Sequence, residues 1–576
     1  VEATGFKKFI RSQNRLEPNL PRTVDVTLEV GAVTETVEVT ASVAAVQADT
    51  ATVGRLVESS VIQNMMLNGR NPIWLALLKA GVRSGSSLAS FSFGLTTAGL
   101  SINGGRTQDF VMNFDGAVAV RTRANGTSIG VADVDTVQEI QILTANYNAE
   151  YGRSAAGQIR LVTKSGTREF HGSLYEYFRN RELNANTWAL NRAGSPRPAH
   201  KYNQFGYIFS GPVFIPDTWN TDRNKLFFLW SQEWVRFRQE STSIITVPSL
   251  AMRRGDFSEL LGPNPFFTGT RVVYDPDTNV PFPNNIIPPS RLSRNGLGFL
   301  RAYPEPTPGF LQGRNNFIQT RPNPQNQRKD TLSIDFIPKP SHTFRLRHQN
   351  YSYTAVDAFR GGTDRAITDW NRPNKTASLN YIWTISPTMV NELLVTASVD
   401  RVYIGVYRPG ERYARSKYGI DYPYIFPERK EIYDKIPTIT IANFATVDGG
   451  PYPAFSSGPI YVFSNNMTKI YGNHTFKWGV SYERSGQNDF DQINVTGVPG
   501  GTNNQNGRFV FTDSRAGAPT TRLAVANAAM GLFDTYAEIG QRAFTPYRAN
   551  MFEWFVQDSW KVTPKFRLEL GVRHTY

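Results

Sequence analysis

The feature that most constrains this chain is a hairpin in which apolar and polar residues alternate strictly. In residues 331–351 the apolar side chains occupy one parity on both sides of a turn at residues 338–341. These apolar positions are Leu332, Ile334, Phe336, Phe344 and Leu346. Because successive side chains of a strand point to opposite faces, the pattern predicts a ribbon with one apolar face and one polar face.

The same alternation recurs in three more hairpins, whose turns lie at residues 386–389, 472–473 and 563–565. The connections between hairpins are uneven and run from about 25 to about 90 residues, well above the loop lengths of ordinary compact domains. Short turns at one end of the strands and long loops at the other end are typical of a transmembrane β-barrel.

A soluble β-sandwich or β-propeller would show the same alternation. Two observations favour the barrel. The apolar parity is rich in Trp, Tyr and Phe near the strand ends, as in the aromatic girdles of membrane barrels, and soluble domains seldom carry such long loops. We therefore predict a mainly β fold built on a transmembrane antiparallel β-barrel.

About 11 barrel strands are predicted from residue 168 onward. They lie near residues 168–180, 201–213, 225–238, 331–337, 342–352, 376–385, 390–400, 464–471, 474–484, 551–561 and 565–576. With this assignment every short turn falls on one side of the barrel. The long loops, near residues 239–330, 401–463 and 485–550, then all project from the other side.

Residues 43–165 have a different pattern. They contain Gly- and Ser-rich loops between residues 83 and 105, a predicted helix at Asn71–Leu78, and predicted strands at Val137–Leu143 and Gln158–Thr163. Pro72 stands near the start of the helix, where proline is tolerated. The pattern predicts a small compact α+β domain ahead of the barrel.

The composition excludes several classes of protein. No run of 18 or more apolar residues is present, so no transmembrane helix is predicted, and a barrel requires none. The chain has no Cys, which excludes disulfide frameworks and thiolate metal sites. The net charge of +14 comes from dispersed Lys and Arg residues without a recognisable nucleic-acid-binding module, so no nucleic-acid partner is predicted.

Several motifs, in order along the chain, resemble those of TonB-dependent outer-membrane receptors. Glu35–Ala41 resembles their TonB box, and Gly157–Gly166 resembles the end of their plug domain. A further set of motifs is similar to the Oar-like branch of this family: Leu67–Asn71, Ile102–Arg106, Asp115–Gly116, Glu150–Arg153 and His171–Phe178. Members of this branch carry a carboxypeptidase-regulatory-like domain before the plug, and Val1–Gly31 resembles the tail of that domain.

The resemblance implies a division into four parts. Residues 1–31 are the tail of a carboxypeptidase-regulatory-like β domain, 32–42 a TonB-box-like segment, 43–165 the plug, and 166–576 the N-terminal half of a barrel with long extracellular loops. The family implies a barrel of about 22 strands. Because an open sheet edge is costly in hydrocarbon, we expect a second half after Tyr576 to close the barrel, and a true start upstream of Val1.

The candidate TonB box has a physical rationale. An extended segment rich in Val and Thr can add itself as a strand to the exposed sheet edge of a partner protein. The alternative is that this segment forms a hairpin with Val24–Leu28 inside the truncated N-terminal domain. The residues of the candidate box are Glu35, Thr36, Val37, Glu38, Val39, Thr40 and Ala41.

Two further groups of candidate residues follow from the expected architecture. Basic residues of the plug are expected to pair with barrel carboxylates and hold the plug in the lumen: Arg70, Arg106, Arg153 and Lys164. Aromatic and basic residues of the long loops are expected to contact a ligand: Tyr403, Arg408, Tyr452 and Tyr461. The sequence offers no catalytic constellation, and its six His residues lack metal-ligand spacing, so neither an enzyme, a cofactor nor a metal is predicted.

The resemblance implies a receptor in the outer membrane of a Gram-negative bacterium that imports a scarce or bulky ligand. Its implied partners are TonB with the inner-membrane ExbB/ExbD motor, outer-membrane lipid and lipopolysaccharide, and an unknown extracellular ligand. Two alternatives use the same barrel without active import. One is a surface or adhesive protein whose plug stays closed, and the other is an export protein.

Overall fold

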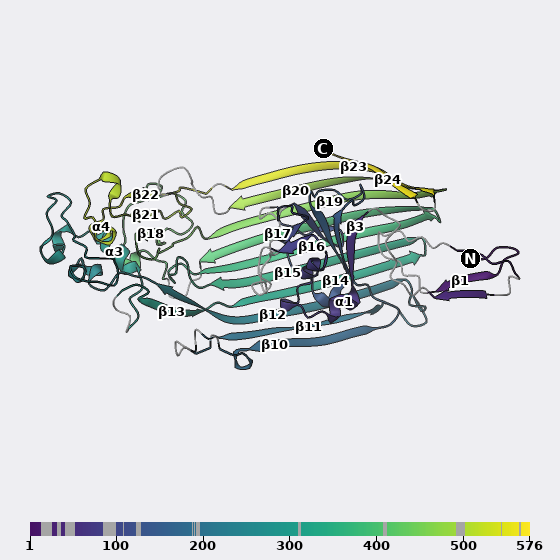
Figure 1. Ribbon diagram of the computed structural model, residues 1–576, viewed down its shortest axis with the longest axis horizontal. Helices are drawn as coiled ribbons and strands as arrows, with labels where there is room; N and C mark the ends of the chain where they lie inside the picture. The colour runs from purple at the N-terminus through teal and green to yellow at the C-terminus, as the bar shows by residue number, and fades with distance from the viewer. Residues whose placement is uncertain are drawn as a thin grey trace.

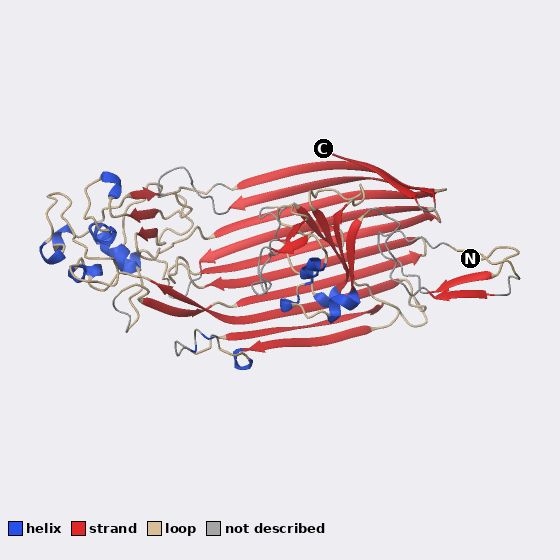
Figure 2. Ribbon diagram, viewed as in Figure 1, coloured by secondary structure: helices blue, strands red, loops and turns tan. Residues whose placement is uncertain are grey.

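The structure is a computed structural model of the 576-residue chain. It describes residues 1–12, 26–31, 36–40, 52–84, 100–107, 109–122, 128–186, 188, 191, 196–197, 199–308, 313–406, 412–490, 501–542, 544–563 and 566–576. Within these residues the chain forms four parts. They are a small N-terminal sheet, a compact domain, a large sheet, and a folded region built from the long connections (Figures 1 and 2).

The large sheet, which we call the wall, has its strands in the order β10-β11-β12-β14-β15-β16-β17-β19-β20-β23-β24, each antiparallel to its neighbours. These eleven strands of the described chain overlap the eleven predicted ones, and β13 pairs off this path with β12. Their bounds are His171–Asn180, His200–Pro212, Leu226–Ile245, Gln325–Lys339, His342–Asp357, Thr368–Ser386, Met389–Val406, Ala454–Tyr471, His474–Phe490, Thr545–Thr563 and Phe566–Thr575.

The register of the wall places side chains of one kind in rows across the strands. One row, from β12 to β23, is apolar throughout: Phe228, Ile334, Leu346, Leu379, Val395, Phe463, Tyr482 and Phe552. Leu346 is 39% exposed, whereas the neighbouring Arg347 is only 6% exposed. The apolar parity therefore faces outward and the polar parity faces the compact domain, which confirms the predicted two-faced ribbon and excludes a sandwich with a dry centre.

The compact domain, which we call the plug, lies against the middle of the wall (Figure 1). It is built on a five-stranded sheet in the order β3-β8-β9-β6-β7 and a β4-β5 hairpin. The predicted helix near residue 72 is a 3-10 helix, capped by Asn71, whose side chain accepts from the Ile73 amide at 3.1 Å. The plug elements are β3 Val53–Glu58, α1 Ser59–Asn64, η1 Asn68–Arg70, η2 Pro72–Leu78, β4 Val82–Ser84, β5 Leu100–Ile102, β6 Phe110–Phe114, β7 Ala117–Val118, η4 Val134–Thr136, β8 Val137–Ala145 and β9 Gly157–Thr163.

The three long connections fold together into one region at the far end of the wall from the N-terminus, which we call the cap (Figure 1). Residues 246–316, 412–453 and 501–544 contribute to its apolar core, although the sequence predicted only loops there. The wall strands also extend further into the connections than predicted. Its elements are η6 Met252–Arg254, η7 Ser258–Leu260, η8 Pro283–Asn285, η9 Pro289–Arg291, α3 Arg294–Ala302, β13 Phe317–Pro322, η11 Ser416–Tyr418, β18 Thr438–Ile441, β21 Arg508–Phe511, η12 Arg515–Gly517, α4 Ala524–Met530 and β22 Thr535–Ala537.

Two close approaches show how the cap is assembled. Strand β18 pairs in parallel with β21, and β21 pairs with β22, so that two different connections share one small sheet. Helices α3 and α4 lie so close that a Cβ on Gly296 would stand 2.1 Å from the Ala528 carbonyl oxygen. Among the described residues, no helix is long and apolar enough to cross a bilayer.

The N-terminal sheet lies at the opposite end of the wall, on the side of the short turns (Figure 1). It consists of β1 (Lys8–Ser12) and β2 (Thr36–Thr40), which pair in parallel with Lys8 opposite Thr36. The alternative in which the TonB-box-like segment forms a hairpin with Val24–Leu28 is therefore wrong. Residues 26–28 form no strand, residues 24 and 25 lie outside the described chain, and the partner of β2 is β1.

Candidate functional site at the interface of the plug and the wall

The plug touches nearly the full width of the wall, mainly through polar contacts and at one place through an apolar contact of Val111 and Val118 with Ile460 of β19. Most apolar residues of the plug are gathered in its own core around Ile62, Met112 and Ile140. The inner face of the wall carries the polar parity, so charged and hydroxyl groups meet there. Plug residues contact side chains from β10, β12, β14, β15, β16, β17, β20, β23 and β24, which means that the wall curves around the plug.

A group of five charged residues, which we call the β12 cluster, joins the plug to β12 and β14. It comprises Arg70, Asp133, Asp135, Glu233 and Lys329. Arg70 of the plug lies 2.5 Å from Asp135 and 3.8 Å from the buried carboxylate of Glu233 on the wall. The ammonium group of Lys329 lies 2.5 Å from the same carboxylate. Glu233 is therefore held between one cation of the plug and one cation of the wall.

Asp133 extends the β12 cluster through a hydroxyl group. One oxygen of its carboxyl group accepts from Ser231 Oγ on β12 at 2.7 Å, and the other accepts from the Asp135 amide at the start of η4. Burial and the nearby carboxylates of Glu233 and Asp135 raise the pKa of Asp133 to about 7. This contact between plug and wall is therefore sensitive to protonation near neutral pH.

A second ion pair joins the plug to β17. Arg121 Nε lies 2.6 Å from Asp400 Oδ2, and the two side chains are only 4% and 2% exposed. Beside this pair, Asn374 Nδ2 of β16 donates to the Ile129 carbonyl oxygen at 2.6 Å. Removing either partner of a pair this buried leaves an uncompensated charge, so this contact strongly favours the docked plug.

A cavity separates the plug from the wall on the side of β17 to β24. It is lined by acidic and basic groups in nearly equal number: Glu150, Arg153, Arg160, Glu392, Glu483, Glu553 and Arg573. Glu150 lies 2.9 Å from Lys477, and Arg153 lies 3.0 Å from Glu483. Although burial opposes ionisation of Glu150, Lys477 and Arg160 outweigh it and lower the pKa of this carboxyl group. On this side the plug is held by charge pairs around an open polar space.

The four predicted plug cations differ in their contacts. Arg70 and Arg153 form ion pairs with wall carboxylates, as described above. Arg106 instead pairs with Asp109 of the plug at 3.2 Å, and its side chain is 81% exposed. Lys164 lies at the edge of the plug beside Asp135, and its backbone amide donates to the Thr136 carbonyl oxygen. The ion-pair partner of Arg106 therefore lies within its own domain and not on the wall, unlike the role expected of it.

The predicted ligand contacts do not gather on one loop surface. Tyr403 and Tyr461 lie within β17 and β19, on the outward parity, because these strands extend beyond the predicted bounds. Tyr452 is only 4% exposed and packs against Trp370 inside the cap end of the wall. Arg408 lies outside the described residues. The prediction assumed exposed loops at positions that belong to strands and to a packed core.

The TonB-box-like segment is described only in part. Thr36, Val37, Glu38, Val39 and Thr40 form β2, whereas Glu35 and Ala41 lie outside the described residues. In the described chain β2 pairs on one side only, with β1. No described residue pairs with its other edge.

Sequence reasoning missed the acceptors on the wall and one plug cation. Glu233, Asp400 and Glu483 are buried at 1%, 2% and 4% exposure, and all three lie on the inward parity of their strands. The sequence did contain a signal for them. Each is a carboxylate at a polar position of a long strand, and the polar positions face the lumen, where the plug lies. Arg121 offered no such signal, because it follows a short plug strand in an irregular segment.

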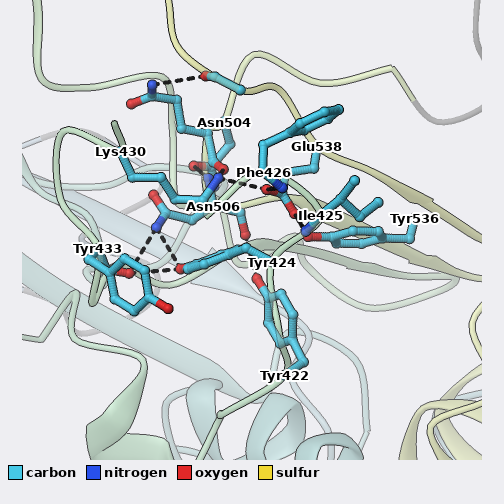
Figure 3. A network of polar contacts seen from close by, with 12 residues as sticks. Tyr422, Tyr424, Ile425, Phe426, Lys430, Tyr433, Asn504, Asn506, Tyr536 and Glu538 are labelled. Atoms are coloured by element: carbon cyan, nitrogen blue, oxygen red, sulfur yellow. Dashed lines mark hydrogen bonds and ion pairs between the residues drawn. The ribbon is translucent and has the colours of Figure 1, made fainter. Parts of the chain in front are cut away.

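The cap holds a second polar network, drawn in Figure 3, which joins residues 412–453 to residues 501–544. The Glu538 carboxylate accepts from the amides of Ile425 and Phe426, both at 3.0 Å, and from Lys430 Nζ at 2.7 Å. Asn506 Nδ2 donates to the Tyr424 hydroxyl oxygen at 2.7 Å. Burial raises the pKa of Tyr424 to about 12, so this phenol stays protonated. The network fastens two connections of the cap to each other.

No cofactor site emerges from the part of the chain that the structure describes. No group of three or more His, Cys, Asp or Glu side chains in that part is arranged to hold a metal ion. The charged groups of the interface are engaged mainly with one another, as the pairs above show. The chemistry of the site is thus reversible ionic contact between two folded bodies.

An outward apolar face, a polar inner face and a folded domain held against that inner face define a membrane β-barrel with a plug. A family model described as "Outer membrane beta barrel domain" matches residues 162–576, and the chain belongs to this family. The protein is therefore a component of the outer membrane of a Gram-negative bacterium.

Among curated proteins, the chain is similar to the TonB-dependent transporter Oar of Myxococcus xanthus. The two are 27% identical over 229 residues, which cover 38% of this chain and 20% of the relative. Among solved structures, it resembles the outer membrane transporter YddB of Escherichia coli, with a TM-score of 0.49 and 12% identity over 92% of this chain and 58% of that one. It also resembles the siderophore receptor PirA of Pseudomonas aeruginosa, with a TM-score of 0.44, 10% identity, and 91% and 55% covered. The chain thus spans a fifth of the curated relative and little more than half of these structures.

Proposed function

We propose that the protein is a TonB-dependent receptor that imports a ligand through its plugged barrel. The observation that carries the proposal is the folded plug, held against the inner wall by ion pairs at Glu233, Asp400 and Glu483. Such a plug blocks free diffusion. A protein with this architecture transports only if the plug is displaced, and the similarity to a TonB-dependent transporter supports displacement by an energised partner.

The proposed partner is TonB, driven by the ExbB/ExbD motor of the inner membrane. The edge of β2 that no described residue pairs with supports this assignment, because main-chain hydrogen bonds can attach a partner strand there without a large binding surface. The segment lies at the short-turn end of the wall, away from the cap (Figure 1). In the sequence, residues 41–52 connect this segment to the plug, so the chain itself would carry an applied force there.

The proposed ligand binds from the cap side, between the cap and the outward end of the plug. The cap is a packed body with its own apolar core, which would offer a ligand preformed surfaces instead of free loops. The nature of the ligand stays open, and the charge balance of the plug cavity favours a polar one. Mass spectrometry of small molecules that copurify with the native protein would identify it.

Deletion of residues 35–41 tests the energy coupling. We expect uptake of the ligand to be lost while surface binding is retained, because the deletion removes the partner's attachment and leaves cap and plug intact. Collapse of the proton gradient should have the same effect on the unaltered protein. Uptake that continues after either treatment would contradict the proposal.

A narrower test addresses β2 itself. The substitution Val37→Pro removes a main-chain donor and fixes φ, so capture of the periplasmic domain of TonB should fall at least tenfold. The matched control is Val37→Thr, which keeps the donor and the β propensity and should bind normally. Equal capture by both variants would remove the assignment of the box.

A second function is favoured by one observation, the separate core of the cap. A folded cap above a permanently docked plug also suits a surface or adhesive protein that never opens. The deletion of residues 35–41 separates the two functions, since adhesion does not require the partner. An export role would instead show accumulation of the cargo inside the cell in the same deletion.

A further inference from the structure

Four basic residues gather on the outward face of the wall near its cap end. We call them the outer basic patch: Lys201 on β11, Arg236 and Arg238 on β12, and Arg328 on β14. Lys201 stands directly opposite Arg238 in the strand pairing. Arg236 and Arg328 belong to the same outward parity, which on β12 also includes Trp234. The patch therefore faces away from the plug and toward the membrane side of the wall.

The positive charge of the patch is only partly balanced. Arg328 Nε lies 2.9 Å from Asp330 Oδ1. Arg238 donates to the neutral Asn326 side chain at 2.8 Å, and Arg236 donates to the Val235 carbonyl oxygen at 3.4 Å. Among the described residues, Lys201, Arg236 and Arg238 form no ion pair with a carboxylate. Like charges directly opposite each other destabilise a sheet, so this arrangement calls for an external anion.

The level of the patch along the wall indicates where that anion comes from. The outward residues of β12 are Leu226, Phe228 and Trp230, then the polar Gln232, then Trp234, and only after Trp234 the two arginines. Trp234 stacks on Phe205 with ring centroids 5.6 Å apart, and Trp230 Nε1 donates to the Tyr207 hydroxyl oxygen at 3.1 Å. At about 3.4 Å per residue and a tilt of about 40°, Leu226 to Trp234 covers roughly 20 Å of membrane, close to the height of the apolar band of a barrel.

The patch thus lies just above an aromatic layer, on the side of the long connections. That is the level of the headgroups in the outer leaflet, because barrels of this kind keep their short turns in the periplasm. We propose that the outer basic patch binds the phosphate groups of an outer-leaflet lipid, with Arg236 and Arg238 as the main donors. Guanidinium groups suit this role because they pair with phosphate through two parallel hydrogen bonds.

The proposal does not depend on import, since it concerns the outer surface of the wall. It also accounts for part of the excess of basic residues in the chain. The apolar row below the patch would contact the acyl chains, while the patch holds the headgroup. The lipid phosphate thereby replaces the carboxylate partners that Lys201, Arg236 and Arg238 lack among the described residues.

Lipid binding to the purified protein tests the proposal. Native mass spectrometry would count bound lipid after addition of a bisphosphorylated lipid A, its dephosphorylated form, or inorganic phosphate. We expect the bisphosphorylated lipid to bind at least tenfold more tightly than the dephosphorylated one, and inorganic phosphate alone to compete only weakly. Equal binding of both lipids would overturn the proposal, and strong competition by inorganic phosphate would assign the patch to a free anion.

Substitutions locate the binding on the wall. Arg236→Gln with Arg238→Gln should weaken binding of the bisphosphorylated lipid at least tenfold, whereas Arg236→Lys with Arg238→Lys should retain part of it, since charge stays but the paired donors are lost. Arg401→Gln is the matched control, because Arg401 is also exposed on the outward parity, on β17. Heat-modifiable gel mobility confirms folding of each variant. Unchanged binding in the Gln pair, or an equal loss in the control, would overturn the assignment.

Discussion

The plug and the cap are both compact bodies attached to the same wall, but they are held in different ways. The cap is continuous with the wall strands, and its three connections share one apolar core that includes Phe299, Phe511 and Val525. The plug gathers most of its apolar residues in its own core, and apart from a small apolar contact of Val111 and Val118 with Ile460 of β19 it meets the wall through ion pairs and single hydrogen bonds. Separating the cap segments exposes apolar surface to water, whereas separating the plug exposes groups that water solvates well. This contrast is what the proposed function requires, since import would need the plug to leave the wall while the cap stays folded.

The largest effect is expected in the core of the cap. Phe511 is fully buried in β21, so Phe511→Ala should destabilise the cap by about 3–5 kcal/mol. Limited proteolysis would show new cleavage in residues 501–544 while the wall stays intact. Phe533→Ala is the control, because Phe533 is 42% exposed and should cost far less. If the two variants were equally resistant, the cap would not be a cooperatively folded body.

The next effect concerns the docking of the plug. Arg121→Met leaves Asp400 buried without its partner and should weaken docking by about 3 kcal/mol. Because the chain has no Cys, a single cysteine at Thr163, which faces Ser333 of β14, can report plug exposure through its rate of labelling. We expect faster labelling in the Arg121→Met background. A labelling rate equal to that of the parent would mean that the Arg121–Asp400 pair does not hold the plug against the wall.

Protonation should modulate the same interface. The folded-state pKa of Asp133 is raised to about 7 from an ordinary value of about 4, so between these pH values the docked form holds more protons than the undocked form. Docking is therefore stabilised at low pH, and this contribution is lost as pH rises through 7. Asp133→Asn should flatten this dependence. The cysteine reporter, compared between the two proteins at equal pH, measures the difference and cancels the chemistry of the thiol.

The smallest effect is expected at Arg106. Its side chain is 81% exposed and pairs with Asp109 three residues away, so Arg106→Ala should change docking by less than about 0.5 kcal/mol. The cysteine reporter would again measure it. A large effect here would mean that surface charge, and not buried pairing, holds the plug.

Much of the wall could be predicted because its information is local. Alternation over six or more residues fixes a strand and its two faces, and the Pro-containing turns fix the hairpins, so each predicted strand overlaps an observed one. The cap could not be predicted. Its sheet joins β18 to β21, which lie in different connections and pair in parallel, and α3 contains two glycines in a short helix. The strands β18 and β21 and the helix α3 are too short to show a recognisable apolar periodicity in the sequence.

The interface was predicted only on the side of the plug. Arg70 and Arg153 were recognisable as cations in glycine-containing turns, but their distinction from Arg106 depends on which turn faces the wall. Which turn faces the wall depends on how the plug docks and cannot be seen in the sequence of the turn itself. The carboxylates that receive them lie far along the chain: Glu483 is 330 residues after Arg153 (483 − 153), and Glu233 is 163 residues after Arg70 (233 − 70).

The alternating faces of the wall strands limit how these strands can change length. Inserting one residue into β15 would turn Leu346 inward and Arg347 outward, and every residue beyond the insertion would follow. Two inserted residues return every later side chain to its original face and only shift the rest of the strand along its axis by two residues. Over evolutionary time the wall should therefore tolerate insertions and deletions in pairs, while the connections of the cap accept either parity.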